Sequence, residues 1–337
     1  MPQVRRQKGS ILIIVLWALF ILSALAMAIS GYTRAQISVA GKLSQRARDY
    51  YLARAGLERA LIEVKNAAEK DYDSLFDSWS DNDACFKDAV FGDGTYSVIA
   101  YSDVLNSKAP IRYGLADEES KINVNKAPVD ILKNIFEIAG GVSPDDAQAI
   151  AASIINWRSS ADKALKEGAG EFYYQTLDHP YKAKNAPIEA PEELLLVKGV
   201  SRALFNKVKD HITIYGSGVV NINTAGAIVL RSLGLSEETA GMIVDFRSAK
   251  TGNEGASSVN VFEDTAKITA LLTEKGSLST EESGKIGSLI SKNLISVRSD
   301  NFSGIAIGKM GGNTSQAGSR IAFVFDRKNN AIRYWRE

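Results

Sequence analysis

Few side chains in this sequence can act as nucleophiles, general bases or soft metal ligands. The 337-residue chain has two histidines, His179 and His211, and one cysteine, Cys85. Two histidines are too few for most histidine-built metal sites and catalytic triads. The sequence contains no phosphate-binding P-loop, no H-E-x-x-H zinc motif and no G-x-S-x-G nucleophile turn. We therefore expect no enzymatic activity.

One short stretch concentrates carboxylates. Residues 115–120 read LADEES and place Asp117, Glu118 and Glu119 side by side. Carboxylate oxygens are the ligands of hard cations such as Ca²⁺. Three adjacent acids are also typical of a strand end that faces solvent, and we favour that interpretation over a cation site.

The composition limits the class of protein. A chain of 337 residues holds about two domains. Its 40 Lys and Arg residues balance 39 Asp and Glu residues, for a net charge of +1. This balance argues against a broad basic face for nucleic acid and against an acidic tail. A single cysteine excludes a disulfide within the chain and says nothing about the compartment.

The N-terminus carries a membrane-spanning pattern. Arg5, Arg6 and Lys8 precede residues 9–33, which contain no charged side chain. About 20 apolar residues span a bilayer as a helix, whereas the apolar region of a secretory signal is only about 7–15 residues long. The positive-inside rule then places the N-terminus of a single-pass membrane protein in the cytoplasm. Four cations on the far side oppose that rule: Arg34, Lys42, Arg46 and Arg48.

The helical pattern continues beyond the span. Residues 34–70 contain no proline, and apolar side chains recur at helical spacing from Ile37 to Val64. We predict one helix from about Ser10 to Lys70, roughly 90 Å long. Residues 10–33 form its transmembrane part and residues 34–70 its amphipathic part, with Gly31 and Gly41 as soft points.

The basic leader ending in Lys8-Gly9, followed directly by this helix, resembles a type IV pilin or pseudopilin. The resemblance implies that residues 1–9 are a leader that a prepilin peptidase removes. Cleavage then falls between Gly9 and Ser10, and Ser10 becomes the N-methylated first residue. The apolar helix stays on the mature protein. The alternative for this feature alone is a plain single-span anchor.

One position departs from most of that family. The fifth mature residue is usually a glutamate that pairs with the free amine of a neighbouring subunit, and here it is Ile14. A charged group in the bilayer centre costs roughly 3 kcal/mol, so it is retained only where a partner compensates it. A subunit with no neighbour above it lacks that partner. Ile14 therefore indicates a position at the filament tip, with simple drift as the alternative.

The rest of the chain predicts an α+β fold. After a polar loop at residues 71–93, two strands are expected around a turn at residues 105–108, and further strands lie within residues 294–337. Residues 71–120 and 294–337 together predict a pilin-like antiparallel sheet packed on the first helix. Residues 121–293 predict a large inserted all-helical module of the SAM-like, helical-hairpin kind.

The helical module contains an internal echo. KINVNKAPVDILKNI and the helix that follows it return as VVNINTAGAIVLRSL and a second such helix, so each copy holds one helical hairpin. Asn123 and Asn221 lie 98 residues apart, as do Ala127 and Ala225. Both hairpins end in an aromatic residue followed by arginine. Residues 192–216 supply a third helix–turn–helix between them, so two or three hairpins stack in one module.

The segment linking the copies is similar to the type II secretion minor pseudopilin K family (general secretion pathway protein K). Tyr173-Tyr174, PYKAKNAP at residues 180–187 and EELLLVKG at residues 192–199 carry the resemblance, together with residues 117–123 and 221–225. The resemblance implies a minor pseudopilin at the tip of the type II secretion pseudopilus, with its bulk in the periplasm. The implied partners are other minor pseudopilins, the major pseudopilin, the prepilin peptidase, inner-membrane lipid, and a secreted substrate or the outer-membrane secretin.

The resemblance also implies a candidate calcium site, because some members of the family bind Ca²⁺ near a Trp-x-Asp-x-Asp stretch. The matching residues here begin at Asn156, and only Asp162 and Glu171 remain as ligand candidates. Ca²⁺ takes six to eight oxygens, several of them from carboxylates. We expect no cofactor.

Two other functions are compatible with an N-terminal anchor. A tip minor pilin of a type IV or competence-type pilus would use the hairpins as a DNA-binding head. The hairpin turns lack the G-x-G form that faces phosphate, and the second pair of helices carries Glu237, Glu238 and Asp245. A membrane-anchored enzyme would need a convergent catalytic set that the sequence does not offer. Nucleic acid is therefore an unlikely partner.

Overall fold

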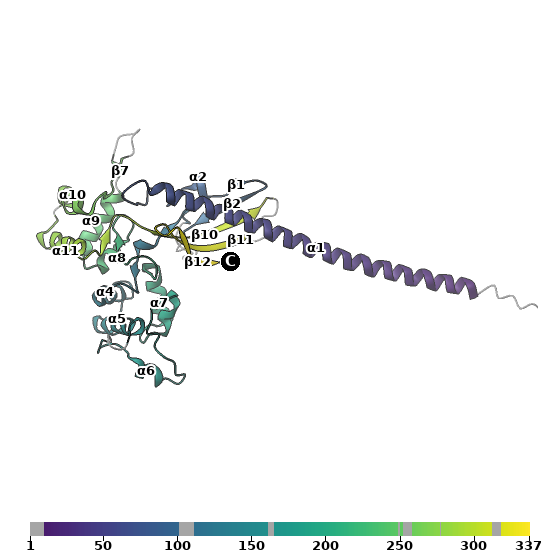
Figure 1. Cartoon of the computed structure of the whole chain (residues 1–337), viewed down its shortest axis with the longest axis horizontal. Helices are drawn as coiled ribbons and strands as arrows, with labels where there is room; N and C mark the ends of the chain where they lie inside the picture. Colours follow the sequence, from purple (N-terminus) through teal and green to yellow (C-terminus); the bar gives the residue numbers. More distant parts are fainter. Residues whose placement is uncertain are drawn as a thin grey trace, which may run out of the picture.

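A long helix leads into a sheet, and a helical head lies at the end of the sheet away from the free part of the helix (Figure 1). The computed structural model describes residues 10–100, 111–160, 165–248, 250–251, 258–276, 278–311 and 318–337. Helix α1 spans Ser10–Ala67 and runs through Gly31 and Gly41 without a break. The pilin-like α+β class with a helical insert is confirmed.

The main sheet is antiparallel and has the strand order β1-β2-β10-β11-β12. Strand β3 pairs with the remaining length of β10. The bounds are β1 Ala89–Phe91, β2 Gly94–Ile99, β3 Ala116–Asp117, β10 Asn301–Met310, β11 Ser319–Asp326 and β12 Ala331–Arg336. The central strand β10 comes from the end of the chain and pairs with β2 from the beginning, so the head is inserted between strands of one sheet.

Helix α1 lies on one face of this sheet along its second half. Leu57, Ala60 and Val64 point into the sheet and are almost fully buried. At Gly308 of β10 the two backbones nearly touch, because an added Cβ would lie 2.1 Å from the carbonyl oxygen of Asp49 and 2.2 Å from the nitrogen of Ala53. Glycine and alanine at this crossing let the helix pack directly on the strand.

The structure corrects two expectations about the sheet. Residues 71–93 were predicted as a loop, but they contain a helical turn, α2 (Asp83–Phe86), and the edge strand β1. The side chain of Asn82 caps α2 by accepting from the N–H of Cys85. The turn at residues 105–108 lies outside the described residues. The strand expected after it is reduced to a bridge between Ile99 and Tyr113 and to β3.

The inserted head was expected to be all-helical, but among the described residues it consists of short helices and three small two-stranded sheets. Strands β4 and β5 pair in parallel, as do β6 and β9, whereas β7 and β8 are antiparallel. The helices are α4 Val129–Ile138, α5 Pro144–Arg158, α6 Glu171–Gln175, η3 Pro191–Leu196, α7 Arg202–Val208, η4 Lys209–His211, α8 Ala227–Ser232, α9 Glu237–Ser248, η5 Thr265–Lys267, α10 Ile268–Lys275 and α11 Thr280–Ser291. The strands are β4 Ile122–Asn123, β5 Ile212–Thr213, β6 Val220–Asn221, β7 Lys250–Thr251, β8 Ser258–Val259 and β9 Ile295–Ser296.

The internal repeat in the sequence corresponds to a repeated structural unit. Each copy has a short strand, an Asn-x-Asn turn and a helical hairpin, α4–α5 in the first and α8–α9 in the second. Asn125 exchanges two hydrogen bonds with the backbone of Ile188, and Asn223 does the same with Phe262. In both copies the second asparagine therefore holds a returning segment of the chain.

The arginine that ends each hairpin closes its own copy. Arg158 and Arg247 each donate two hydrogen bonds to backbone carbonyl groups near the start of the copy, and burial lowers the pKa of both to about 10. The acceptors are Val124 and Ala127 in the first copy and Ile222 and Ala225 in the second.

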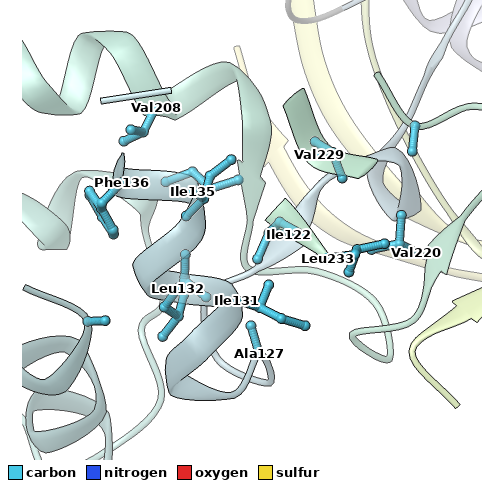
Figure 2. Close-up of a cluster of buried hydrophobic side chains, with 14 of the residues drawn as sticks. Ile122, Ala127, Ile131, Leu132, Ile135, Phe136, Val208, Val220, Val229 and Leu233 are labelled. Carbon is cyan, nitrogen blue, oxygen red and sulfur yellow. The ribbon is translucent and has the colours of Figure 1, made fainter. Parts of the chain in front are cut away.

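The two copies share a hydrophobic core. Helix α4 packs against both α5 and α8, and side chains from both copies and from α7 gather there (Figure 2). The labelled residues in that view are Ile122, Ala127, Ile131, Leu132, Ile135, Phe136, Val208, Val220, Val229 and Leu233. A separate cluster holds α1 to the sheet, with Trp79, Phe302 and Phe323 fully buried.

The close crossing of α1 and β10 gives a test of the fold. Gly308→Ala should lower the stability of the folded chain by roughly 1–3 kcal/mol, because its Cβ would meet backbone that cannot move aside. Gly287→Ala in α11 is the control, since nothing lies within 4 Å of that position and alanine favours a helix interior by up to about 1 kcal/mol. Thermal unfolding should show opposite signs for the two variants. Equal behaviour would contradict the helix-on-sheet packing.

Candidate functional site

The candidate site has two parts. One is the N-terminal helix. The other is the buried polar junction between sheet and head, here called the seam, which is built on residues 117–119 and on the Asp73–Arg327 ion pair. Helix α1 is long and apolar enough to cross a membrane, judged by length and composition. Gly9 lies outside the described residues, and Ser10 is the first residue of α1. Ile14 lies in the exposed part of the helix with 66% of its surface accessible. The cleavage site and the role of Ile14 stay predictions.

Helix α1 has a second face that the sheet does not cover, and this face extends to both sides of Asp49. Tyr51 and Ile62 are exposed at 65% and 48%, and Ile37 lies further along the same side of the helix. Residues 37, 51 and 62 fall within a narrow arc at 100° per residue, opposite the residues that pack on the sheet. This apolar stripe is open in the isolated chain.

The carboxylate cluster at residues 117–119 is not a solvated strand end. Asp117, Glu118 and Glu119 are 3%, 4% and 5% exposed, so the sequence-based interpretation was wrong. They lie on β3 and on the 3₁₀ turn η1 (Glu118–Ser120), where the last sheet residues meet the head. A buried carboxylate is tolerated only when donors surround it.

Each of the three acids has its own set of donors. Asp117 accepts hydrogen bonds from the hydroxyl groups of Ser299 (2.6 Å) and Thr224, from the amide of Asn221 (3.3 Å), and from the backbone N–H of Glu119 (2.8 Å). These donors come from the head, from the segment before β10 and from η1. One side chain thus joins its own turn to two distant parts of the chain.

Glu118 and Glu119 extend the network into the sheet and the head. Glu118 accepts from Lys121 (2.7 Å), from Ser303 of β10 (2.6 Å) and from Thr213 of β5. Glu119 accepts from both the backbone N–H and the side-chain amide of Asn301. Within the described part of the chain, Glu118 is the one of the three acids that forms an ion pair, with Lys121.

An ion pair completes the seam on the side of α1. The guanidinium of Arg327 donates to both oxygens of Asp73, at 2.9 and 2.7 Å, and both side chains are almost fully buried. Arg327 also donates to the carbonyl groups of Ser299 and Val64, the latter in the last turns of α1. It stacks over the ring of Phe302. A bidentate arginine of this kind fixes geometry as well as charge.

Burial and crowding shift the protonation of the acids. Burial raises the pKa of Asp117 to about 6 despite the hydroxyl donors. Burial and then the charge of Asp117 raise the pKa of Glu119 well above its usual range. For Glu118 burial acts in the same direction, but Lys121 and the two hydroxyl donors outweigh it and lower the pKa.

A cavity of about 490 Å³ opens beside this seam. It lies between the head loop at residues 214–217 and the turn after β11, and its walls include Glu119, Asp326 and Arg333. Asp326 is already bonded to Asn329 and Arg333. The lining is of mixed charge and offers no single chemistry for a ligand.

Of the two candidate calcium ligands, the structure describes one. Asp162 lies outside the described residues. The carboxylate of Glu171 accepts from the N–H of Ala183 and from the side chain of Gln175, so both oxygens are engaged within the head. No group of three or more His, Cys, Asp or Glu side chains that could hold a metal occurs among the described residues. Ca²⁺ needs more carboxylates than this.

The long apolar helix, the sheet beneath its second half and the inserted head define a pilin-like protein. Residues 112–217 match the family described as type II secretion system (T2SS), protein K. The chain is 24% identical over 269 residues to the type II secretion system protein K of Aeromonas hydrophila, a match that covers 77% of this chain and 76% of the relative. Both sequence matches are to protein K of the type II secretion system.

A solved structure supports the fold. The chain resembles the GspK-GspI-GspJ complex from the type 2 secretion system of enterotoxigenic Escherichia coli with a TM-score of 0.61 and 17% identity. The match covers 90% of this chain and 96% of the matched chain. At this identity the likeness concerns the pilin-like fold with its helical head.

The raised pKa of Asp117 predicts a pH dependence of stability. The folded chain holds this proton more tightly than the unfolded chain, whose carboxyl group has its ordinary pKa near 3.8. The resulting stabilisation is full below about pH 4 and is lost as the pH rises through about 6, a change of about 2–3 kcal/mol. Asp117→Asn cannot titrate. The stability of the parent chain minus that of the variant should therefore fall from about pH 4 to about pH 7.

Chemical denaturation across that pH range measures the difference. Asp71→Asn is the matched control, because the side chain of Asp71 is fully exposed. Its difference from the parent chain should stay flat. A difference for Asp117→Asn that is equally flat would show that this carboxyl group titrates as if it were in water.

Proposed function

We propose that this chain is a minor pseudopilin that occupies the tip of a type II secretion pseudopilus. The observation that carries the proposal is a protein K-like head inserted into a pilin-like sheet whose helix extends far beyond the body. Residues 10–33 anchor it in the inner membrane with the N-terminus in the cytoplasm and the body in the periplasm. The role is structural, without catalysis and without a cofactor.

The tip position follows from the two ends of the molecule. Ile14 replaces the usual fifth-position glutamate, so this subunit has no charge for the amine of a subunit above it. The head lies at the far end of the body from the anchor and adds bulk where a following subunit would stack. The subunit therefore begins or caps the filament during protein export across the outer membrane.

Partner subunits bind through the open stripe of α1. The matched structure holds GspK with GspI and GspJ, and we extend that partnership to the corresponding minor pseudopilins here. The stripe of Ile37, Tyr51 and Ile62 is the surface that the apolar face of a neighbouring pilin helix fits. Further contacts with the major pseudopilin, a secreted substrate or the secretin belong to the assembled filament.

The alternative, a DNA-binding head on a type IV or competence-type pilus, is not favoured. Both sequence matches are to secretion proteins. The exposed acids at the start of α9, Glu237 and Glu238, would repel phosphate where a second hairpin should approach DNA.

Processing gives the first test of this proposal. Co-expression with a prepilin peptidase should yield a protein that lacks residues 1–9 and begins with N-methylated Ser10, as seen by intact mass and N-terminal sequencing. Gly9→Leu should keep its leader. Gly31→Leu is the control, because that glycine has nothing within 4 Å in α1, and this variant should still be cut. An intact Met1 in the parent chain would remove the pseudopilin assignment.

Assembly gives the second test. Ile62→Lys places a charge in the open stripe and should reduce co-purification of partner minor pseudopilins by roughly tenfold or more, since burying an unpaired charge costs several kcal/mol. The melting temperature should hardly change, because Ile62 is half exposed in the isolated chain. Phe172→Lys, at an exposed apolar residue of the head, is the control. Equal recovery of partners with both variants would exclude the stripe as the binding surface.

A further inference from the structure

The part of α1 between the anchor and the body is purely basic. Arg34, Lys42, Arg46 and Arg48 lie there, and no acidic residue occurs before Asp49. The positive-inside rule favours cations on the cytoplasmic side, whereas these four lie on the opposite side of the span. Neither the anchor nor the helix stripe explains them.

The body adds two cations at the end from which α1 emerges. The N–H of Met310 in β10 donates to Asp49, and the hydroxyl of Ser319 in β11 donates to the carbonyl of Arg46. These bonds place that end of the sheet level with residues 46–49 of the helix. We call the following six side chains the basic collar: Arg34, Lys42, Arg46, Arg48, Lys309 and Arg320.

The basic collar is exposed and uncompensated. All six residues are exposed, and none of them forms an ion pair with an acid in the described part of the chain. Of the acids at this end, Asp49 is 6% exposed and accepts from the N–H of Met310, whereas Asp93 in the β1–β2 turn and Glu337 after β12 are exposed. The six cations of the collar outnumber these exposed acids, so the net charge at this end of the body is positive.

Two exposed apolar side chains lie at the same end of the sheet as the basic collar. Val90 and Phe91 of the edge strand β1 are 80% and 59% exposed. The N–H of Gly311 donates to the carbonyl of Asp93, which brings the β1–β2 turn to the same end of the sheet as Lys309. Basic side chains around exposed apolar ones are typical of surfaces that rest on a lipid interface.

The spacing along α1 brings this surface near the bilayer. Arg34 directly follows the span, and Arg46 lies 12 residues further, about 18 Å at about 1.5 Å per residue. The headgroup layer is about 5–7 Å thick, and electrostatic attraction extends a further ~8–10 Å in physiological salt. Tilt of α1 brings the end of the body across the remaining distance. Gly31 and Gly41, which have no packing neighbours, offer places for the helix to bend.

We propose that the basic collar docks the body of the unassembled subunit on the anionic headgroups of the leaflet through which α1 emerges. This inference rests on the proposed function, in which residues 10–33 anchor the chain and the body lies outside that leaflet. Lipid is the occupant because the collar begins at the end of the span and its remaining members lie at the end of the body from which the span emerges. The open stripe, which faces away from the sheet and is apolar, is the surface left for protein partners.

Docking holds the body close to the membrane until partners bind the stripe. Each lysine or arginine near an anionic surface shifts the ratio of docked to undocked body by about fivefold. Extraction into a filament must then break these contacts. The attraction is screened by salt, which gives it a signature that apolar insertion lacks.

Energy transfer between the body and the headgroups tests the proposal. The full chain, with Cys85→Ser and a donor dye on Val90→Cys, is placed in nanodiscs that carry an acceptor on a headgroup. Discs of phosphatidylcholine alone are compared with discs that contain phosphatidylglycerol. We expect higher transfer in the anionic discs and loss of the difference in molar salt.

A charge-matched pair of variants isolates the collar. The collar variant changes Lys42, Arg46, Arg48, Lys309 and Arg320 to Gln and should lose the lipid dependence. The control changes five exposed cations of the head to Gln and should keep it: Lys126, Lys166, Lys182, Arg202 and Lys292.

Each outcome separates the two proposals. A chain that enters the discs but gives equal transfer in both lipids, or a collar variant that keeps the difference, overturns the docking inference and leaves the anchor in place. A difference that arises only after partner subunits are added assigns the collar to protein contact and also overturns it. A chain that does not enter the discs at all removes the anchor and the docking inference together.

Discussion

The buried carboxylates at the seam constrain the rest of the structure. Asp117, Glu118 and Glu119 leave water as the sheet meets the head, and each loses hydration worth several kcal/mol unless donors replace it. The donors come from the loop before β10, from β10 itself and from two places in the head. The network is satisfied only when all these segments are in place. A partly assembled junction would leave buried carboxylates without donors and would be less stable than a junction with no buried carboxylates. The orientation of the head is therefore tightly specified.

The connectivity of the sheet makes this constraint act between segments that are far apart along the chain. Strand β10 lies at the centre of the sheet, yet more than half of the chain separates it from its neighbour β2. The two copies in the head are built from local contacts and close on themselves through Arg158 and Arg247. The sheet under α1 cannot form until β10 and β11, near the C-terminus, have paired, and pairings between distant segments form slowly during folding. The head can therefore be ordered early, with the seam as the last part to close.

Sequence patterns predicted the elements whose signal is local. The apolar run and the unbroken helical spacing predicted α1 to within three residues of its end, and the repeated N-hydrophobic-N motif predicted the two copies of the hairpin. The stretch Lys328-Asn329-Asn330 also predicts a tight turn between two strands, and β11 and β12 are joined there with Asn330 at a φ of 49°. Such features depend on neighbours within a few positions.

The seam could not be predicted in the same way. Three adjacent acids look solvated because their donors lie about 100 to 185 residues away, at Thr213, Asn221, Ser299 and Ser303. The partner of Asp73 is further still, at Arg327. The aromatic-arginine pairs were visible as a pattern, but their carbonyl acceptors were not. Edge strand β1, only three residues long, gave too short an alternation to read.

The seam also joins the head to the anchor. Arg327 bonds to the Val64 carbonyl on α1, to Asp73 in the segment that follows the helix, and to Ser299 beside Asp117. A displacement of the head therefore acts on the helix through a buried guanidinium rather than through a loose linker. The head also contacts the segment after α1 through Tyr72, which packs against the head core, and through the side-chain amide of Asn221, which donates to the carbonyl of Asp73. The sheet, which α1 meets backbone to backbone at Gly308, joins the helix to the same body. Because several buried contacts join these parts, we expect the head and the part of α1 after Asp49 to move together, with the remaining freedom in the uncovered helix before Asp49.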